Sequence, residues 1–290
     1  MKLKFLGYFL FIAGCFIVSL YAQFPGKMAA KYIEQTFSQI NSQIKIEIDN
    51  VTPSFPPGMK IESILINYAD TPIARLENFK SFFKLFTLFS DTVTGSFKAD
   101  VFNGIISGIV RVSKEKPREI GIETDLGNLN LKNIHMGKSL SDGRFSGILN
   151  GKVTVDFKQG HIRKNYGELK FMDLILQFPE ALFAVETYSF SSGNIKFFMP
   201  KQNIIKIEDC ILKGRQIDVQ TSGEIKVARE FQKSILNFKA RIVLYPMFFM
   251  NAGDSVPVDI SKNESDNAII SLKIGGTIQN PTITMTQGTK

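Results

Sequence analysis

Residues 93–112, VTGSFKADVFNGIISGIVRV, hold two candidate strands, Val93–Phe102 and Ile105–Val112, on either side of Asn103-Gly104. A two-residue hairpin turn of this kind needs a positive φ at both central positions, and Asn-Gly is a pair that adopts it readily. We therefore expect an antiparallel β-hairpin whose turn is centred on Asn103 and Gly104.

The same pattern extends in both directions along the chain. Ile44, Ile46 and Ile48 alternate with charged residues, as in a strand with one buried face, and a proline-rich break at 53–58 leads into another strand that ends at Tyr68. No linker or change in composition divides the chain beyond Ile44, so we expect one elongated, mainly β domain over 44–290. Further strands are expected at Glu119–Asp125, Gly143–Phe157, Tyr166–Gln177, Asn194–Met199, Ile204–Leu212, Ile217–Val227, Ile235–Leu244, Ala268–Ile274 and Thr282–Met285.

One segment has helical rather than strand spacing. In Asn78–Ser90, NFKSFFKLFTLFS, five phenylalanines share one side of a helical wheel, with Lys80, Lys84 and Thr87 opposite. We expect either a helix that caps the end of the sheet or an interfacial helix that lies on a bilayer. The five residues are Phe79, Phe82, Phe83, Phe86 and Phe89.

The composition limits the chemistry that the chain can perform. It has 290 residues and a net charge of +8, with 44% hydrophobic and 21% charged residues, which is typical of a folded protein. It contains 26 Phe and no Trp, but only 2 His and 2 Cys, so sites built on several histidines or cysteines are nearly excluded. Cys210 is the only thiol after the first apolar run, and we expect it to be a buried apolar residue.

The N-terminus carries a candidate membrane segment. Phe5–Ala22 contains no charged residue and follows Lys2 and Lys4. As a helix it would be about 27 Å long, close to the thickness of a bilayer core. We expect an uncleaved anchor with a short cytoplasmic N-terminus (1–26 in all), followed by a helical stalk over 27–43.

Two other fates of this segment remain open. A cleaved signal peptide would need small residues before the cut, and Leu20-Tyr21-Ala22 fits that rule poorly. Ile12-Ala13-Gly14-Cys15 resembles a lipobox, which would make Cys15 a lipidation site, although the apolar run continues beyond it.

Catalytic motifs are missing from the sequence. Gly137-Lys138-Ser139 lacks the earlier glycine of a phosphate-binding loop, since Lys132 takes that place. His135 and His161 have no further soft ligand near them in the sequence, and the carboxylates are scattered along the strands. The lysines and arginines are also dispersed, which argues against nucleic-acid binding and favours a position near anionic lipid headgroups. We expect a protein that is not an enzyme and has no cofactor or metal.

Several short motifs resemble type II secretion system protein N, and more distantly the AsmA-like envelope proteins. Tyr21-x-x-Phe24-Pro25 follows the apolar segment, and Pro53-Ser54-Phe55-Pro56-Pro57-Gly58-Met59 leads into the second strand. The other matching stretches are Gly147-x-x-x-Gly151, Gly167-x-Leu169-x-Phe171-x-Asp173, Lys213-Gly214, Ser222-Gly223-Glu224-Ile225 and Gly275-Gly276-Thr277-Ile278-Gln279-Asn280-Pro281, while 178–190 and 254–267 match nothing.

This resemblance implies a single-pass protein of the bacterial inner membrane whose β domain lies in the periplasm. It implies an accessory role in type II secretion, through contacts with other secretion subunits. The AsmA likeness implies a curved, twisted sheet whose concave apolar face forms a groove that binds lipid. Two functions thus remain in competition: a secretion component that acts by protein contacts, and a lipid-binding or lipid-transfer protein of the envelope.

Overall fold

The fold is seen in a computed structural model of the 290-residue chain. It describes residues 7–8, 11–12, 14–15, 18–19, 21–40, 44–54, 57–68, 71–115, 119–133, 144–158, 161–182, 185–201, 203–228, 230–252, 261–262 and 268–285.

Within these residues, fifteen strands form a single antiparallel sheet. From β1 to β12 every strand pairs with its neighbours in the chain, and β14 then pairs with β12, β13 and β15. The strands are β1 (Ile44–Ser54), β2 (Gly58–Tyr68), β3 (Thr71–Phe83), β4 (Thr92–Val101), β5 (Gly104–Ser113), β6 (Glu119–Asn130), β7 (Arg144–Lys158), β8 (His161–Leu182), β9 (Val185–Lys201), β10 (Ile204–Gly214), β11 (Ile217–Lys226), β12 (Ile235–Leu244), β13 (Ser261–Lys262), β14 (Ala268–Gly276) and β15 (Pro281–Met285).

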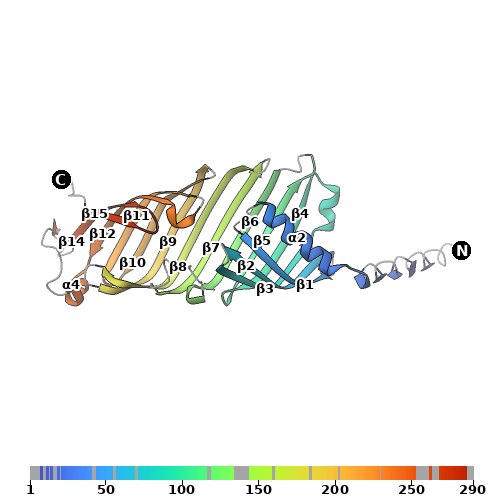
Figure 1. Ribbon diagram of the computed structural model, residues 1–290, viewed down its shortest axis with the longest axis horizontal. Helices are drawn as coiled ribbons and strands as arrows, with labels where there is room; N and C mark the ends of the chain where they lie inside the picture. The colour runs from blue at the N-terminus through green and yellow to red at the C-terminus, as the bar shows by residue number, and fades with distance from the viewer. Residues whose placement is uncertain are drawn as a thin grey trace.

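The strands follow one another in chain order along the long axis of the molecule. The first and last strands of the chain therefore lie at opposite ends of the sheet (Figure 1). Five short helical elements with defined bounds accompany this sheet in the described part of the chain. They are α2 (Gly26–Ile40), α4 (Pro246–Ala252), and the 3-10 turns η1 (Leu85–Phe89), η2 (Leu131–Asn133) and η3 (Phe231–Lys233). The prediction of a mainly β chain with an antiparallel meander is confirmed.

The hairpin between β4 and β5 forms, but its turn lies one residue earlier than expected. Val101 pairs with Gly104, and the central residues are Phe102 and Asn103, with φ of 49° and 59°. Two glycines of β5 favour this register. A Cβ on Gly108 would lie 2.5 Å from Cζ of Phe97, and one on Gly104 would lie 2.5 Å from the carbonyl oxygen of Asn128. In this alignment Gly108, which has no side chain, lies opposite the Phe97 ring, and Gly104 lies against the backbone of β6.

The predicted helix over Asn78–Ser90 is wrong. Phe79, Phe82 and Phe83 belong to β3, which pairs with β2 and β4, and only Leu85–Phe89 forms a short 3-10 turn that contains Phe86 and Phe89. A strand at this position joins the hydrogen-bonded ladders of two neighbours, whereas a helix would leave the facing edges of β2 and β4 unpaired. Pairing in the sheet therefore overrides the helical spacing.

The membrane segment predicted at Phe5–Ala22 lies partly outside the described residues, Phe5 included. Residues 7–8, 11–12, 14–15, 18–19 and 21–22 are helical, and the side chains of Tyr8 and Phe11 are each 70% exposed. No helix in the described part of the chain is long and apolar enough to cross a membrane.

The helical stalk expected over 27–43 corresponds to α2 (Gly26–Ile40), while 41–43 lie outside the described residues, and α2 packs on the sheet instead of projecting from it. It lies against β1 and β2, where Ala30 forms a small buried cluster with Val51 and Ile61. Glu34 also reaches β1, because its Oε1 accepts a hydrogen bond of 2.8 Å from the backbone N–H of Ile48. The helix thus covers the first edge of the sheet.

Candidate functional site

The most extensive chemical feature of the molecule is the division of the sheet into an apolar and a polar face. Neighbouring rows of residues that run across the strands illustrate the division. One row reads Leu129, Leu149, Phe171, Gly193, Leu212, Val219, Ile242 and Ile270 from β6 to β14. The adjacent row reads Asn150, Lys170, Asn194, Ile211, Gln220, Arg241 and Ser271 from β7 to β14.

The same division continues into the N-terminal half of the sheet. Val110 pairs with Ile122, which pairs with Val155, while on the opposite side Arg111 faces Gly121. Because side chains alternate along a strand, these apolar residues lie on the same side of β7 as Leu149. We call this side the apolar face. In the strands β4–β7 it comprises Val93, Phe97, Ala99, Val101, Ile106, Val110, Val112, Ile120, Ile122, Leu126, Leu149, Val153, Val155 and Phe157.

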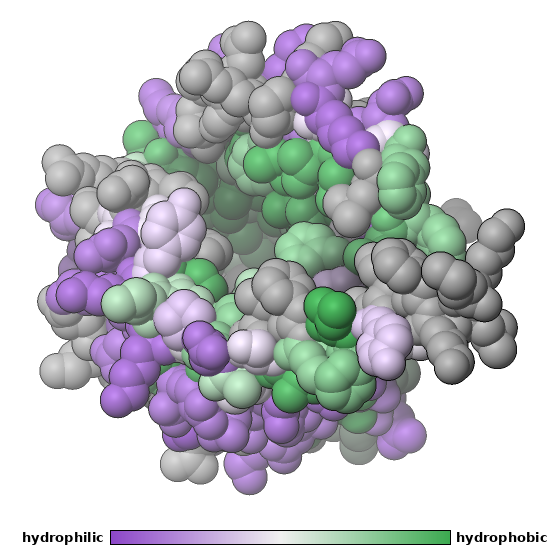
Figure 2. Space-filling view, turned by 90° about the vertical axis from the view of Figure 1, so that its right-hand side faces the viewer, coloured by the Kyte–Doolittle hydropathy of each residue, from purple (hydrophilic) through white to green (hydrophobic). Residues whose placement is uncertain are grey.

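The apolar face lies in a hollow. Figure 2 views the molecule along its long axis from the end that carries the N-terminus, and hydrophobic residues surround a recess at its centre while hydrophilic residues cover the outside. Side chains alternate along each strand, so a sheet that bends toward its apolar side has an apolar inner surface and a charged outer surface. The recess is therefore lined mainly by apolar side chains.

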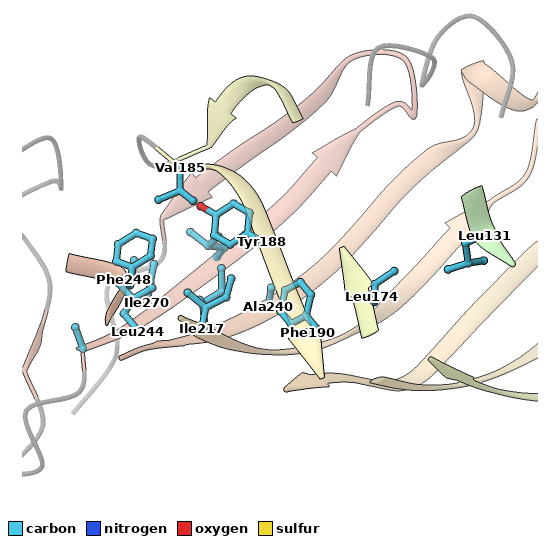
Figure 3. Packing of buried hydrophobic residues seen from close by; sticks show 13 residues of the cluster. Leu131, Leu174, Val185, Tyr188, Phe190, Ile217, Ala240, Leu244, Phe248 and Ile270 are labelled. Atoms are coloured by element: carbon cyan, nitrogen blue, oxygen red, sulfur yellow. The ribbon is translucent and has the colours of Figure 1, made fainter. Parts of the chain in front are cut away.

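Packing seals the C-terminal end of the apolar face. Phe248 of α4 and Leu244 of β12 are each only 1% exposed, and the ring of Phe248 meets Phe249 edge to face at 5.6 Å. Figure 3 shows Phe248 gathered with Tyr188 and Ile270, with Leu174 and Leu131 farther along the same side. This end has a conventional buried core.

The middle of the apolar face is not sealed in this way. On β5–β7 the side chains of Ile106, Val110, Ile122, Val153 and Val155 are all only partly buried. None of them belongs to the buried cluster near α4 or to the cluster beneath α2. A stretch of partly exposed apolar side chains thus lies between two packed ends.

Cys210 lies on the apolar face, where it pairs with Ile195 of β9 and Thr221 of β11. Its side chain is buried, as expected from the sequence, and burial raises the pKa of the thiol to about 11, with a smaller contribution from the charge of Asp209. A thiol that stays protonated at neutral pH is a poor nucleophile. Cys210 therefore contributes to the apolar lining.

The cross-strand ion pairs of β5–β7 lie on the polar face. Arg111 Nη1 lies 2.6 Å from Glu123 Oε1, and Lys152 Nζ lies 3.9 Å from Glu123 Oε2. The hydrogen bond and the charge of Arg111 hold the pKa of the Glu123 carboxyl below its usual value. Lys158 and Glu119 form a similar pair at 3.3 Å between β6 and β7. These exposed cross-strand pairs keep the outer side of the sheet hydrated.

Three of the five phenylalanines of the predicted helix belong to β3 and the other two to η1. Phe79 packs into the cluster beneath α2 and stacks on Phe97, with ring centroids 6.3 Å apart and planes at 15°. Phe82 is partly buried and Phe83 is 48% exposed on β3. Phe86 and Phe89 project from η1, and their side chains are 92% and 93% exposed. The five residues therefore do not share one face, because Phe79 is packed while Phe83, Phe86 and Phe89 are exposed.

Groups suited to metal or covalent chemistry do not converge where the structure can be read. No three His, Cys, Asp or Glu side chains among the described residues lie close enough to hold a metal ion. His135 lies outside the described residues, and His161 begins β8 opposite Lys158. Cys15 is exposed. The candidate site is thus the apolar face, and the sequence motifs alone did not single out its partly exposed middle.

Comparisons with protein-family models, with curated proteins and with solved structures find no match to this chain. The site must therefore be interpreted from its own geometry.

Proposed function

We propose that this protein is a non-enzymatic lipid-binding component of the cell envelope, in which the apolar face holds the acyl chains of lipids. The N-terminal segment anchors the chain in the bacterial inner membrane, and the sheet lies in the periplasm as a curved groove. The observation that carries the proposal is the partly exposed middle of the apolar face, between the packed ends at α2 and α4.

The energetics of exposed apolar surface support this assignment. Each methylene group removed from water contributes about 0.8 kcal/mol, so an uncovered stretch of valine, isoleucine and leucine side chains favours an apolar occupant. A folded partner protein would need a protruding shape to enter the recess seen in Figure 2. A flexible hydrocarbon chain needs only the space between the side chains.

The dimensions also suit lipid. Neighbouring strands lie about 4.8 Å apart, so the nine strands β4–β12 extend over roughly 38 Å. The hydrocarbon core of a bilayer is about 30 Å thick. Acyl chains laid along the strand order would fit within the apolar face. The charged pairs, such as Arg111–Glu123, lie on the opposite side of the sheet, away from the surface that would hold the acyl chains.

An accessory role in type II secretion stays a prediction from the resemblance. Contacts with secretion subunits would use the outer face or the sheet edges, and the described residues single out no such surface for a particular subunit. Normal export of secreted enzymes after deletion of the gene would count against that role, without affecting the lipid-binding proposal.

The test compares lipid retained by two matched variants of the full chain. Val110→Asp with Val153→Asp places charges on the apolar face, and Ile109→Asp with Thr154→Asp places them at adjacent positions on the polar face. Each protein is purified in the same detergent, and bound phospholipid is measured by mass spectrometry. We expect the first pair to lose most of its phospholipid and the second to retain it. Equal retention by both would refute the proposal, because lipid around the anchor is common to them.

A further inference from the structure

We propose that the η1 turn is a second membrane contact, which inserts Phe86 and Phe89 into the interface of an anionic bilayer. This inference rests on the proposed membrane anchoring, but it does not require that the apolar face binds lipid. It concerns the connection between β3 and β4, at the end of the sheet where the chain begins.

The exposure of the η1 turn is unusual for a folded protein. Phe86 and Phe89 are 92% and 93% exposed, and Phe83 and Leu85 just before them are 48% and 46% exposed. Single exposed apolar side chains are normal, but four within seven residues form a patch of the kind that meets a membrane or a partner. Phenylalanine and leucine are also among the residues that interfacial segments bury in the boundary between headgroups and acyl chains.

Hydrogen bonds hold this turn in place. The Thr87 hydroxyl donates to the Lys84 carbonyl at 2.6 Å and accepts from the backbone N–H of Thr94 at 3.0 Å. The Ser90 hydroxyl donates to the carbonyl of Thr92 at 3.0 Å. The polar side chains of η1 therefore satisfy the backbone of the turn and of β4, and the phenylalanine side chains are left pointing outward. A rigid presentation lowers the entropic cost of insertion.

The charges around the turn select an anionic surface. Lys84 precedes η1, and Lys80 of β3 pairs with Lys98 of β4 on the polar face, all three with exposed side chains. Asp91 is the one exposed carboxylate in 80–98, so this part of the chain has a local excess of positive charge. Lysines beside inserted aromatic residues draw such segments to anionic headgroups.

The position of η1 agrees with this role. In Figure 1 the teal turn after β3 lies at the end of the sheet from which the N-terminal segment extends. The described side chains of that segment, such as Phe11 and Val18, are themselves 70% and 68% exposed. Two apolar contacts at the same end would fix the orientation of the sheet relative to the membrane, whereas a single anchor would leave it free to rotate.

The absence of tryptophan from the chain allows a direct test. The full-length protein with Phe86→Trp is reconstituted into vesicles of phosphatidylethanolamine and phosphatidylglycerol, with or without lipids brominated in their acyl chains. Insertion shifts the emission to shorter wavelength and makes the brominated lipids quench it. Tyr166→Trp, at a 40% exposed position of the polar face in β8, is the control that we expect to show neither effect. Tyr8→Trp reports the anchor itself.

The outcomes separate the two proposals. Quenching at positions 8 and 86 but not at 166 supports the η1 contact. Quenching at 8 without quenching at 86 overturns it and leaves the anchor intact, while a lack of quenching at 8 contradicts the anchor whatever occurs at 86. In the Phe86→Trp chain, Lys84→Glu and Phe89→Asp should each reduce quenching, and Ile283→Asp on β15 should not. If Lys84→Glu has no effect, the anionic selectivity is wrong.

Discussion

Glu34 and Ile48 join α2 to the first strand of the sheet, through the 2.8 Å hydrogen bond from the Ile48 backbone N–H to Glu34 Oε1. Among the described strands β1 pairs with β2 alone, so its other edge would offer unpaired donors to another strand. The carboxylate of Glu34 satisfies one of these donors and holds α2 over Val51 and Ile61. This bond closes the N-terminal end of the apolar face.

Removal of the Glu34 acceptor should loosen this end. Glu34→Ala leaves the Ile48 N–H without its partner, at a cost of about 1 kcal/mol, and amide exchange at Ile48 should become roughly fivefold faster. Glu34→Gln keeps a carbonyl acceptor at the same reach and serves as the control. Hydrogen–deuterium exchange measured on peptides from β1 tests this. Equal exchange in the two variants would show that the bond does not hold the edge.

Gly167 tests how closely the apolar face is packed. A Cβ at this buried position would lie 2.2 Å from Cζ of Phe197 on β9, so Gly167→Ala must displace the ring. We expect a loss of about 1–3 kcal/mol in the free energy of unfolding, measured by urea denaturation. Gly121→Ala is the matched control on the polar face, where the nearest atom is Asp156 Oδ1 at 3.2 Å. A control that loses as much as Gly167→Ala would contradict this packing.

Cys210 should make stability depend on pH in the alkaline range. The pKa of its thiol rises from 9.0 in the unfolded chain to about 11 in the fold, so the folded state favours the protonated form. This contribution is complete below pH 9 and is lost as the pH rises from 9 to 11, by about 1.4 kcal/mol at pH 10. The difference in unfolding free energy between pH 7 and pH 10 should be smaller in Cys210→Ala by this amount. An unchanged difference would show that the thiol is not desolvated.

Much of the sheet could be predicted because many strands carry their own alternation. Ile235–Leu244, for example, has an apolar residue at every second position from Leu236 to Leu244, and it coincides with β12. The Asn103-Gly104 pair located the hairpin to within one residue, but the close approach of Phe97 to Gly108 across the strands decided the register. Local sequence does not contain that contact.

Other parts of the fold depend on neighbours that the sequence does not show. Phe79 and Phe83 have helical as well as alternate spacing, and pairing with β2 and β4 selected the strand. In the unassigned stretch 178–190, residues 178–182 extend β8 and 185–190 extend β9 beyond the expected strands, and Tyr188 and Phe190 enter the buried cluster. The partly exposed middle of the apolar face could not be predicted either, because it depends on how much of this face α2 and α4 cover.

The most direct test of lipid binding compares two adjacent positions on β7. Val153 lies on the apolar face and Thr154 on the polar face, so benzoylphenylalanine placed at either one differs only in the side of the sheet that it samples. The full chain is irradiated in living cells, and adducts are identified by mass spectrometry. We predict phospholipid adducts at position 153 and none at position 154. Adducts at both positions in equal yield, or at neither, would contradict the proposal that the apolar face holds lipid.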